Sequence, residues 1–353
     1  MRRGLISWSK TELPASVLDA RVKRAQAAMG AAGVDALAIY SDPARTAGAS
    51  WLTGFVPYWN RGVVVLPRDG KAVLLTGMSK RVHGWIQKNS HLEEVAYSTS
   101  IGADVAARVA ARKGAVIAVP DIGSVPGGIL YGIAGDGVSV VDGTELLAGL
   151  RTVPDPSELA FAFKAATLAR VALARATAIE SDAATLVGLV DGEARRLGAE
   201  EVYVALAPDL ARSTSLVRLE GTAALGASFA LRLSLAYKGV WVRMSRTLAR
   251  DESVAAEIAA ATERFAAAVA LLPRLDALDD LPYWLVEGCR TLMPLQPLAG
   301  SMLPDRLALA PGSYVSVQAR IDTARGPALI GAPVLLGRDG DTAALMASPL
   351  FET

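Results

Sequence analysis

The sequence predicts two domains, an α/β domain over residues 1–150 and an α+β domain over residues 151–353. Three observations support this division. Runs with helical apolar spacing alternate with short β-type runs in the first 150 residues, an order typical of an α/β layer. A proline-containing junction follows at 151–158, and residues 229–247 in the second half show two-residue alternation on both sides of a turn. With 353 residues, the chain has the length of two ordinary domains.

The composition is that of a globular protein with a large core, with 52% hydrophobic and 20% charged residues. A net charge of +1 gives no reason to expect nucleic acid or an acidic membrane as a partner. The single cysteine excludes an internal disulfide framework and suits a reducing cytoplasm. The basic first ten residues are not followed by an apolar signal core, and no uninterrupted apolar run reaches roughly 18 residues. We therefore expect a cytoplasmic protein.

The elements of the first domain follow from apolar spacing. Residues 15–29 have helical spacing and are followed by Gly30 and Gly33, which predicts a helix that ends there. Residues 36–40 are typical of a buried strand. The other expected elements are strands at 63–67, 72–75, 116–120 and 138–141, and a helix at 104–112.

The junction at 151–158 separates the two domains. Pro154 and Pro156 end any preceding helix, and Ser157 is the expected cap of the next one. Beyond the junction we expect helices at 158–181, 184–197 and 253–272, a short helix near 282–289, and strands near 314–321 and 332–336.

Residues 229–247 are expected to form a β-hairpin, because apolar and polar residues alternate on both sides of a glycine-containing turn. If Tyr237 and Lys238 form a two-residue loop, Leu233 faces Val242 on an apolar face. The same register places Arg232 opposite Arg243 on the other face, where like charges repel.

This hairpin resembles the first metal-binding hairpin of the creatinase / aminopeptidase P / prolidase family, whose C-terminal domain has the pita-bread fold. The family pattern is roughly D-x-G-x-x-x-x-G-Y-x-x-D-x-T-R-T, and Gly239 and residues 245–247 fit it. The two aspartates of the pattern fall on Arg232 and Arg243. The resemblance therefore implies a retained scaffold with two metal ligands replaced by cations.

Two further stretches extend the resemblance over nearly the whole chain. SDPARTAGASWLTGF, after residue 40, resembles the family's S-D-P-x-N-x-x-Y-L-T-G-F, and the junction resembles R-x-V-K-D-P-x-E-L with Pro154 in place of the lysine. The resemblance implies a creatinase-like N-terminal domain at 1–150 and a pita-bread domain at 151–353. It also implies a homodimer, because the family's site is completed across two chains. A heterodimer with an active paralogue is the alternative.

The other metal-binding positions depart from the family pattern in the same way. The resemblance places Cys289 at the metal-binding histidine, Gln296 at the second, catalytic histidine, and Gln318 and Gly331 at the two glutamates. A further family histidine would lie near Ser215. A pair of divalent ions needs carboxylate and imidazole ligands, and arginine offers no lone pair. We therefore expect no metal and no other cofactor.

The remaining chemistry-bearing residues have two interpretations each. His83 and His91 are eight residues apart, a poor ligand spacing, so a surface role is expected. Cys289, next to Arg290, is either a nucleophile with a lowered pKa or a small buried apolar residue, and no histidine is available as its base.

Trp59–Asn60–Arg61 resembles the aromatic-x-Arg loop with which creatinase reaches into the neighbouring subunit's site and holds a substrate carboxylate. Arginine binds carboxylates through two parallel hydrogen bonds, which suits that role. The alternative is a tryptophan that packs locally. With Trp59 and Arg61, the expected substrate-binding residues are Arg232, Trp241 and Arg243.

The arginine pair needs a negative partner, or the two side chains must extend apart into water, because two buried, unpaired cations would be costly. Glu287 or Asp322 could supply the charge, and so could the carboxylate or phosphate of a ligand.

Three functions follow from these residues. The first is a metal-independent enzyme with hydrolase or lyase chemistry on a small anionic molecule that contains a C–N bond, with Cys289, Gln296 and Gln318 as catalytic residues. The second is a non-catalytic pseudoenzyme that binds a small anion or a protein partner. The third is an active Xaa-Pro metallopeptidase, which the ligand substitutions disfavour most.

Overall fold

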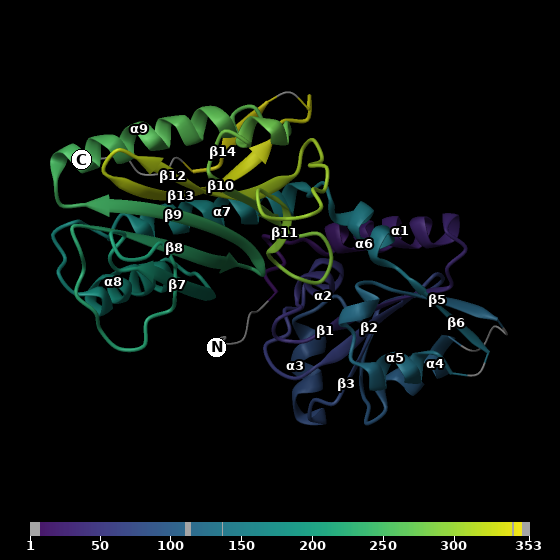
Figure 1. The fold of residues 1–353 in the computed structure, drawn as a ribbon. Helices are drawn as coiled ribbons and strands as arrows, with labels where there is room; N and C mark the ends of the chain where they lie inside the picture. The colour runs from purple at the N-terminus through teal and green to yellow at the C-terminus, as the bar shows by residue number, and fades with distance from the viewer. Residues whose placement is uncertain (1–7, 110–113, 136, 341, 348–353) are drawn as a thin grey trace. The chain divides into compact units, whose positions relative to one another are not determined.

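The computed structural model describes residues 8–109, 114–135, 137–340 and 342–347 (Figure 1). The chain forms two compact units. The first combines Met1–Thr152 with the short segment Cys289–Pro294, and the second combines Val153–Gly288 with Leu295–Thr353. No helix within the described ranges is long and apolar enough to cross a membrane.

The first unit is built on a six-stranded sheet in the order β4-β3-β2-β1-β5-β6. Strands β1, β2 and β3 pair antiparallel, and the outer pairs β3–β4, β1–β5 and β5–β6 are parallel. Every residue of β1 and β3 is buried, which is why their sequences are almost continuously apolar. The strands are β1 (Ala36–Ser41), β2 (Gly62–Pro67), β3 (Val73–Thr76), β4 (Glu94–Tyr97), β5 (Ala115–Val119) and β6 (Val138–Asp142).

The helices of this unit confirm the predicted alternation with strands. They are α1 (Ala15–Ala31), α2 (Ala47–Thr53), α3 (His83–Lys88), α4 (Ile101–Val109), α5 (Gly127–Ile133) and α6 (Thr144–Arg151). The predicted helix at 104–112 corresponds to α4, and its last residues, 110–112, lie outside the described residues. Helices α4 and α5 pack closely because both carry a glycine at the contact. A β-carbon on Gly102 would lie 2.2 Å from the carbonyl oxygen of Ile129.

The segment Cys289–Pro294 completes the core of the first unit although it comes from the second half of the sequence. Leu292 is fully buried in this core, and its carbonyl accepts a hydrogen bond of 3.1 Å from the amide of Ala47. The hydroxyl of Thr291 donates to Asp121 at 2.5 Å, and the guanidinium of Arg151 donates to the Thr291 carbonyl. The segment is therefore held by both apolar packing and hydrogen bonds.

The second unit is built on an antiparallel eight-stranded sheet in the order β11-β10-β12-β13-β9-β8-β7, with β14 paired to β13. Helices α7 and α8 pack against β7, β8 and β9, and α9 packs against β9, β12 and β13. The strands are β7 (Glu201–Ala207), β8 (Ser228–Tyr237), β9 (Val240–Ala249), β10 (Tyr283–Gly288), β11 (Gln296–Gly300), β12 (Tyr314–Thr323), β13 (Gly326–Leu336) and β14 (Ala343–Leu345). The helices are α7 (Pro156–Leu173), α8 (Ala183–Arg196) and α9 (Glu252–Val269).

Three sequence-based predictions about this unit were wrong. The short helix expected near 282–289 is strand β10, in which the alternate residues Trp284 and Val286 are fully buried. Helix α7 ends at Leu173 rather than near 181. Its cap is Asp155, not Ser157, because the Asp155 carboxylate accepts a 3.0 Å hydrogen bond from the amide of Glu158.

The predicted hairpin is confirmed as β8 and β9, but its register is shifted. The turn residues are Lys238 and Gly239, both with positive φ (50° and 79°), as a tight primed turn requires. Glycine accepts positive φ without strain, so the turn includes it rather than Tyr237. As a consequence Arg232 faces Ser245, and the predicted direct opposition of Arg232 to Arg243 does not occur.

Candidate functional site

A cavity of about 300 Å³ lies against one face of the second unit's sheet. Strands β8, β9, β10 and β12 each contribute a polar side chain to its lining. The polar lining residues are Arg232, Ser245, Tyr283, Gln318 and Arg320, with Thr214 from the preceding loop. Side chains two residues apart on a strand share a face, which is how the alternating sequence brings these groups together. Apolar residues complete the wall.

Arg232 is the charged group at this cavity that lacks a partner. Its guanidinium is half-buried and forms no hydrogen bond or ion pair with any described residue. Burial lowers the pKa of Arg232, and the charge of Arg243 lowers it further, while Glu287 and Tyr283 partly offset both effects. The group remains cationic, since arginine does not deprotonate in proteins. It is therefore a positive charge held in an unfavourable environment.

Arg243 lies on the same face of the hairpin and has two side-chain partners. Its guanidinium forms an ion pair with Glu287 and donates a 2.8 Å hydrogen bond to the hydroxyl of Ser234. Glu287 is thus the acidic partner that the sequence suggested for the arginine pair. The other candidate, Asp322, instead pairs with Arg320 at 2.8 Å.

These pairings leave one net positive charge at the cavity. The charge of Arg243 is balanced by Glu287, and that of Arg320 by Asp322, so among the described residues of the site only Arg232 has no counter-charge. A cavity with a single uncompensated cation is matched by a ligand with a single negative charge.

Gln318 extends over Gly331 on the adjacent strand and accepts a hydrogen bond from the hydroxyl of Ser245. Its amide nitrogen donates to the carbonyls of Val317 and Arg243, at 3.1 and 3.3 Å. The side chain is therefore fixed at both ends. It fills the position next to Gly331 and presents no free carboxylate to the cavity.

The donor set does not fit the two metal ions of the pita-bread peptidases. Among the described lining residues there is no Asp, Glu, His or Cys. Over the described ranges as a whole, no three such side chains gather closely enough to hold an ion. Hard divalent cations need anionic oxygen or imidazole ligands, and a guanidinium at the same place repels them.

The structure brings together only part of the predicted site. Arg232 and Gln318 line the cavity, and Arg243 contacts Gln318 through its carbonyl. Trp241 lies further along β9 and stacks on Tyr203, with ring centroids 5.7 Å apart. Gln296 begins β11 and is not part of the lining.

The other predicted residues belong to the first unit. The thiol of Cys289 donates to the carbonyl of Met293 at 3.3 Å. Trp59 is 52% exposed and packs against Tyr58, so its local packing is partial. Arg61 is exposed.

The two histidines have structural partners within the first unit. A ring nitrogen of His83 is 3.0 Å from the carbonyl of Met78, and one of His91 is 2.8 Å from the carboxylate of Asp19. Both interactions agree with the surface role expected from their spacing.

Two cavity residues were missed from the sequence. Tyr283 was hidden by the incorrect helix assignment at β10. Arg320 could have been found, because it follows Gln318 by two residues in a correctly predicted strand and so shares its face.

Comparisons with known proteins agree with the resemblance stated from the motifs. The model of the creatinase/prolidase N-terminal domain matches residues 21–153. No curated protein matches the chain significantly in sequence.

Several solved structures share the fold of nearly the whole chain. The dipeptidase PepE from Mycobacterium ulcerans is 19% identical with a TM-score of 0.70, over 96% of this chain and 98% of that one. The prolidase from Pyrococcus horikoshii OT3 is 15% identical with a TM-score of 0.71, over 94% and 99%. The N-terminal domain of the FACT complex subunit SPT16 from Cicer arietinum (chickpea) is 12% identical with a TM-score of 0.62, over 94% and 96%. The first unit therefore matches the creatinase/prolidase N-terminal domain over residues 21–153, and the chain as a whole has the two-domain, pita-bread fold of the dipeptidase and prolidase structures.

Proposed function

We propose that this protein binds a small monoanionic molecule in the cavity at Arg232, without a metal. The observation that carries the proposal is the half-buried guanidinium of Arg232, which lines the cavity and has no counter-charge among the described residues. A carboxylate would accept its hydrogen bonds as a charge-assisted pair and would remove the cost of the isolated charge. The site would then bind an anion at the place where the family pattern binds metal cations.

The size and lining of the cavity narrow the ligand class. A volume of about 300 Å³ is at the small end of the range for small-molecule sites. Leu216, Leu285 and Leu329 supply an apolar wall, and the hydroxyls of Thr214 and Tyr283 can hydrogen-bond to a neutral polar group. A small carboxylate that also carries an amide group meets these requirements. Two of the similar solved structures are named as a dipeptidase and a prolidase, and a dipeptide is a small carboxylate with an amide group.

Binding without chemistry is the function that the lining supports best. No described residue of the cavity is a carboxylate, imidazole or thiol, the groups that usually serve as general base or nucleophile. The hydroxyl of Ser245 donates a hydrogen bond to Gln318, and none of the described lining residues is a carboxylate or imidazole that could take its proton. A non-catalytic pseudoenzyme therefore agrees with the site more directly than an active enzyme.

A metal-independent hydrolase or lyase acting on a small C–N compound is the second candidate. The named peptidases among the structural relatives support it, since an amide-bearing carboxylate offers a C–N bond to cleave. An active Xaa-Pro metallopeptidase is the least supported function, because Arg232, Gln318 and Gly331 stand at three ligand positions of the family pattern.

We further propose that the protein is a homodimer in which Trp59 and Arg61 reach the other chain's cavity. The support is the resemblance of this loop and its exposure. A heterodimer with an active paralogue is the alternative. Light scattering at micromolar concentration measures the state, and a monomer would contradict both assemblies.

Calorimetric titration with a panel of small carboxylates, matched neutral amides and amines tests the main proposal. We expect some N-acyl amino acids or dipeptides to bind, and their neutral amides not to bind. Arg232→Met should abolish binding, whereas Arg264→Met, at an exposed position of α9, should not. Equal binding to the parent and to Arg232→Met would refute the anion site. Product formation, followed by NMR on the same mixtures, would favour the enzyme.

A further inference from the structure

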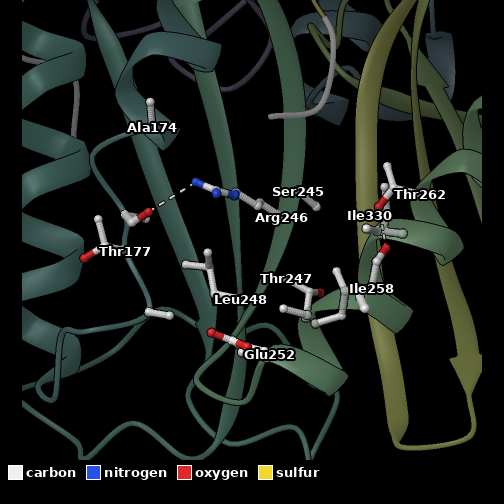
Figure 2. A pocket seen from close by; sticks show the side chains of 16 residues that line it. Ala174, Thr177, Ser245, Arg246, Thr247, Leu248, Glu252, Ile258, Thr262 and Ile330 are labelled. Carbon is white, nitrogen blue, oxygen red and sulfur yellow. Dashed lines mark hydrogen bonds between the residues drawn. The ribbon is translucent and has the colours of Figure 1, made fainter. Parts of the chain in front are cut away.

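A second, larger cavity lies on the helix side of the same unit. It is a groove of about 860 Å³ between the chain that follows α7 and the first half of α9, with β9 as its floor (Figure 2). Its lining is mostly carbon, with many alanines from the post-α7 loop and from α9 and with Leu248, Ile258 and Ile330. Small side chains on both walls leave the groove open.

Arg246 supplies a positive charge within this groove. Because neighbouring residues on a strand point to opposite faces, Arg246 lies on the face of the hairpin away from Arg232 and Ser245. Figure 2 shows its guanidinium directed toward the loop between Ala174 and Thr177. There Nη1 donates to the carbonyls of Leu173 and Ala176, at 3.4 and 3.2 Å.

The remaining donors of Arg246 are free to bind a ligand. No described residue accepts a hydrogen bond from its Nε or Nη2, and no described carboxylate forms an ion pair with it. Burial alone lowers the pKa of Arg246, with no contribution from a neighbouring acid or base. The guanidinium is thus desolvated and only partly hydrogen-bonded.

The other charge on the lining is Glu252, at the start of α9. It is exposed and belongs to the opposite end of the groove in Figure 2. An acid at that end disfavours a second anionic group on the ligand. The groove therefore suits one negative head at Arg246 and a neutral apolar body along the alanine walls.

We propose that this groove is a binding site for an apolar monocarboxylate, a molecule with one carboxylate head and a hydrocarbon body of medium length. The carboxylate would take the free donors of Arg246, and the body would cover the carbon surface between the post-α7 loop and α9. The site is separate from the cavity at Arg232, although Ser245 and Ile330 line both.

Octanoate, octanol and octylamine are the probes for this site, measured by calorimetry and by the shift in melting temperature of the full chain. Octanoate should bind and raise the melting temperature, octanol should bind at least about tenfold more weakly, and octylamine should not bind. Arg246→Met should reduce octanoate affinity by at least about tenfold. The control Arg264→Met, which removes a positive charge elsewhere on α9, should leave it unchanged.

A second variant tests the groove without touching the arginine, because Arg246 also caps α7 and its loss can disturb folding. Ala259→Phe projects a ring from α9 into the groove and should block octanoate while Arg232-dependent binding persists. Arg232→Met should leave octanoate binding intact, so the two sites can fail independently. Lack of octanoate binding at millimolar concentration, or octanoate affinity unchanged in Ala259→Phe, would overturn the proposal.

Discussion

The side chain of Gln318 occupies the space that a β-carbon on Gly331 would need. The two residues face each other on β12 and β13, and a β-carbon on the glycine would lie 2.3–2.5 Å from the amide of Gln318. Real β-carbons essentially never approach so closely. A side chain at position 331 therefore requires the Gln318 amide to move, whereas a glutamate at position 318 would occupy the same space as the glutamine.

Gly331→Ala should lower the free energy of unfolding by about 1–3 kcal/mol, because the new β-carbon displaces the Gln318 amide from its hydrogen bonds. Adding Gln318→Ala to this variant should restore part of the loss, which a double-mutant cycle from urea unfolding would measure. Gly188→Ala, in α8, is the control, since its β-carbon would meet open space. That change should be neutral or slightly stabilising. Additive effects of the two changes at the site would contradict the contact.

Arg243→Met should destabilise the protein by about 3 kcal/mol, because it leaves the nearly buried Glu287 without its ion pair. Arg232→Met should be neutral or stabilising, since the parent guanidinium has no partner to lose among the described residues. Chemical denaturation of the two variants side by side measures the difference. Equal destabilisation would mean that both arginines are structural.

Purification without chelators should give protein with no stoichiometric metal, and added Mn²⁺, Co²⁺ or Zn²⁺ should not produce Xaa-Pro cleavage. The reason is the charge and donor set at the cavity, where Arg232 and Gln318 stand at ligand positions of the family pattern. Elemental analysis and a peptidase assay test this. Stoichiometric metal together with metal-dependent cleavage would contradict both metal independence and the anion site.

Glu200 should make stability fall as the pH rises toward neutrality. Burial raises its pKa from 4.5 to about 7, although the charge and the amide of Lys238 act in the opposite direction. The folded state then holds a proton that the unfolded state has released. The stabilisation, roughly 3 kcal/mol at most, is complete below pH about 4.5 and is lost as the pH rises through about 7.

The variant Glu200→Gln isolates this contribution, because its amide oxygen can still accept the hydrogen bond from Lys238. The difference in unfolding free energy between parent and variant should change as the pH rises from the unfolded pKa of 4.5 through the folded pKa of about 7. A constant difference would show that Glu200 does not titrate there.

Leu292→Ala should cost about 2–5 kcal/mol, since Leu292 is fully buried and its δ-carbon would lie 3.0 Å from a β-carbon at Gly48. The loss should appear in the unfolding transition of the first unit. The exposed Leu271→Ala is the control and should change stability little. A fragment of residues 1–152 should be less stable than the same unit in the full chain.

The sequence predicted the elements that local patterns determine. Strands β1, β2 and β5 have continuous apolar runs, and α1 has regular apolar spacing with Gly33 just beyond its end, so their positions were correct within about two residues. Strand β10 was missed because its sequence, YWLVEG, is a short apolar run whose spacing is compatible with either a helix or a strand. Its type is decided by pairing with β12 and β11, which no local pattern contains.

The candidate site was predictable in its residues but not in its contacts. Motif resemblance selected Arg232, Arg243 and Gln318, and the structure places them together. A one-residue error in the turn, however, displaced the predicted partner by two residues, so Arg243 faces Ser234 and lies diagonally across from Arg232 on the same face. Glu287 forms its ion pair with Arg243, which leaves Arg232 without a counter-charge in the described part of the chain. This pairing depends on the three-dimensional structure and could not be predicted from sequence spacing.

The burial of Leu292 in the first unit has a consequence for synthesis on the ribosome. Arg151, near the end of the first unit's main segment, is 140 residues away from its hydrogen-bond partner Thr291. During translation the N-terminal unit emerges first, but its core remains incomplete until this later segment has also been made. Until then the apolar surface around Ala47 and Gly48 stays exposed on the nascent chain. A chaperone can bind this surface during that time.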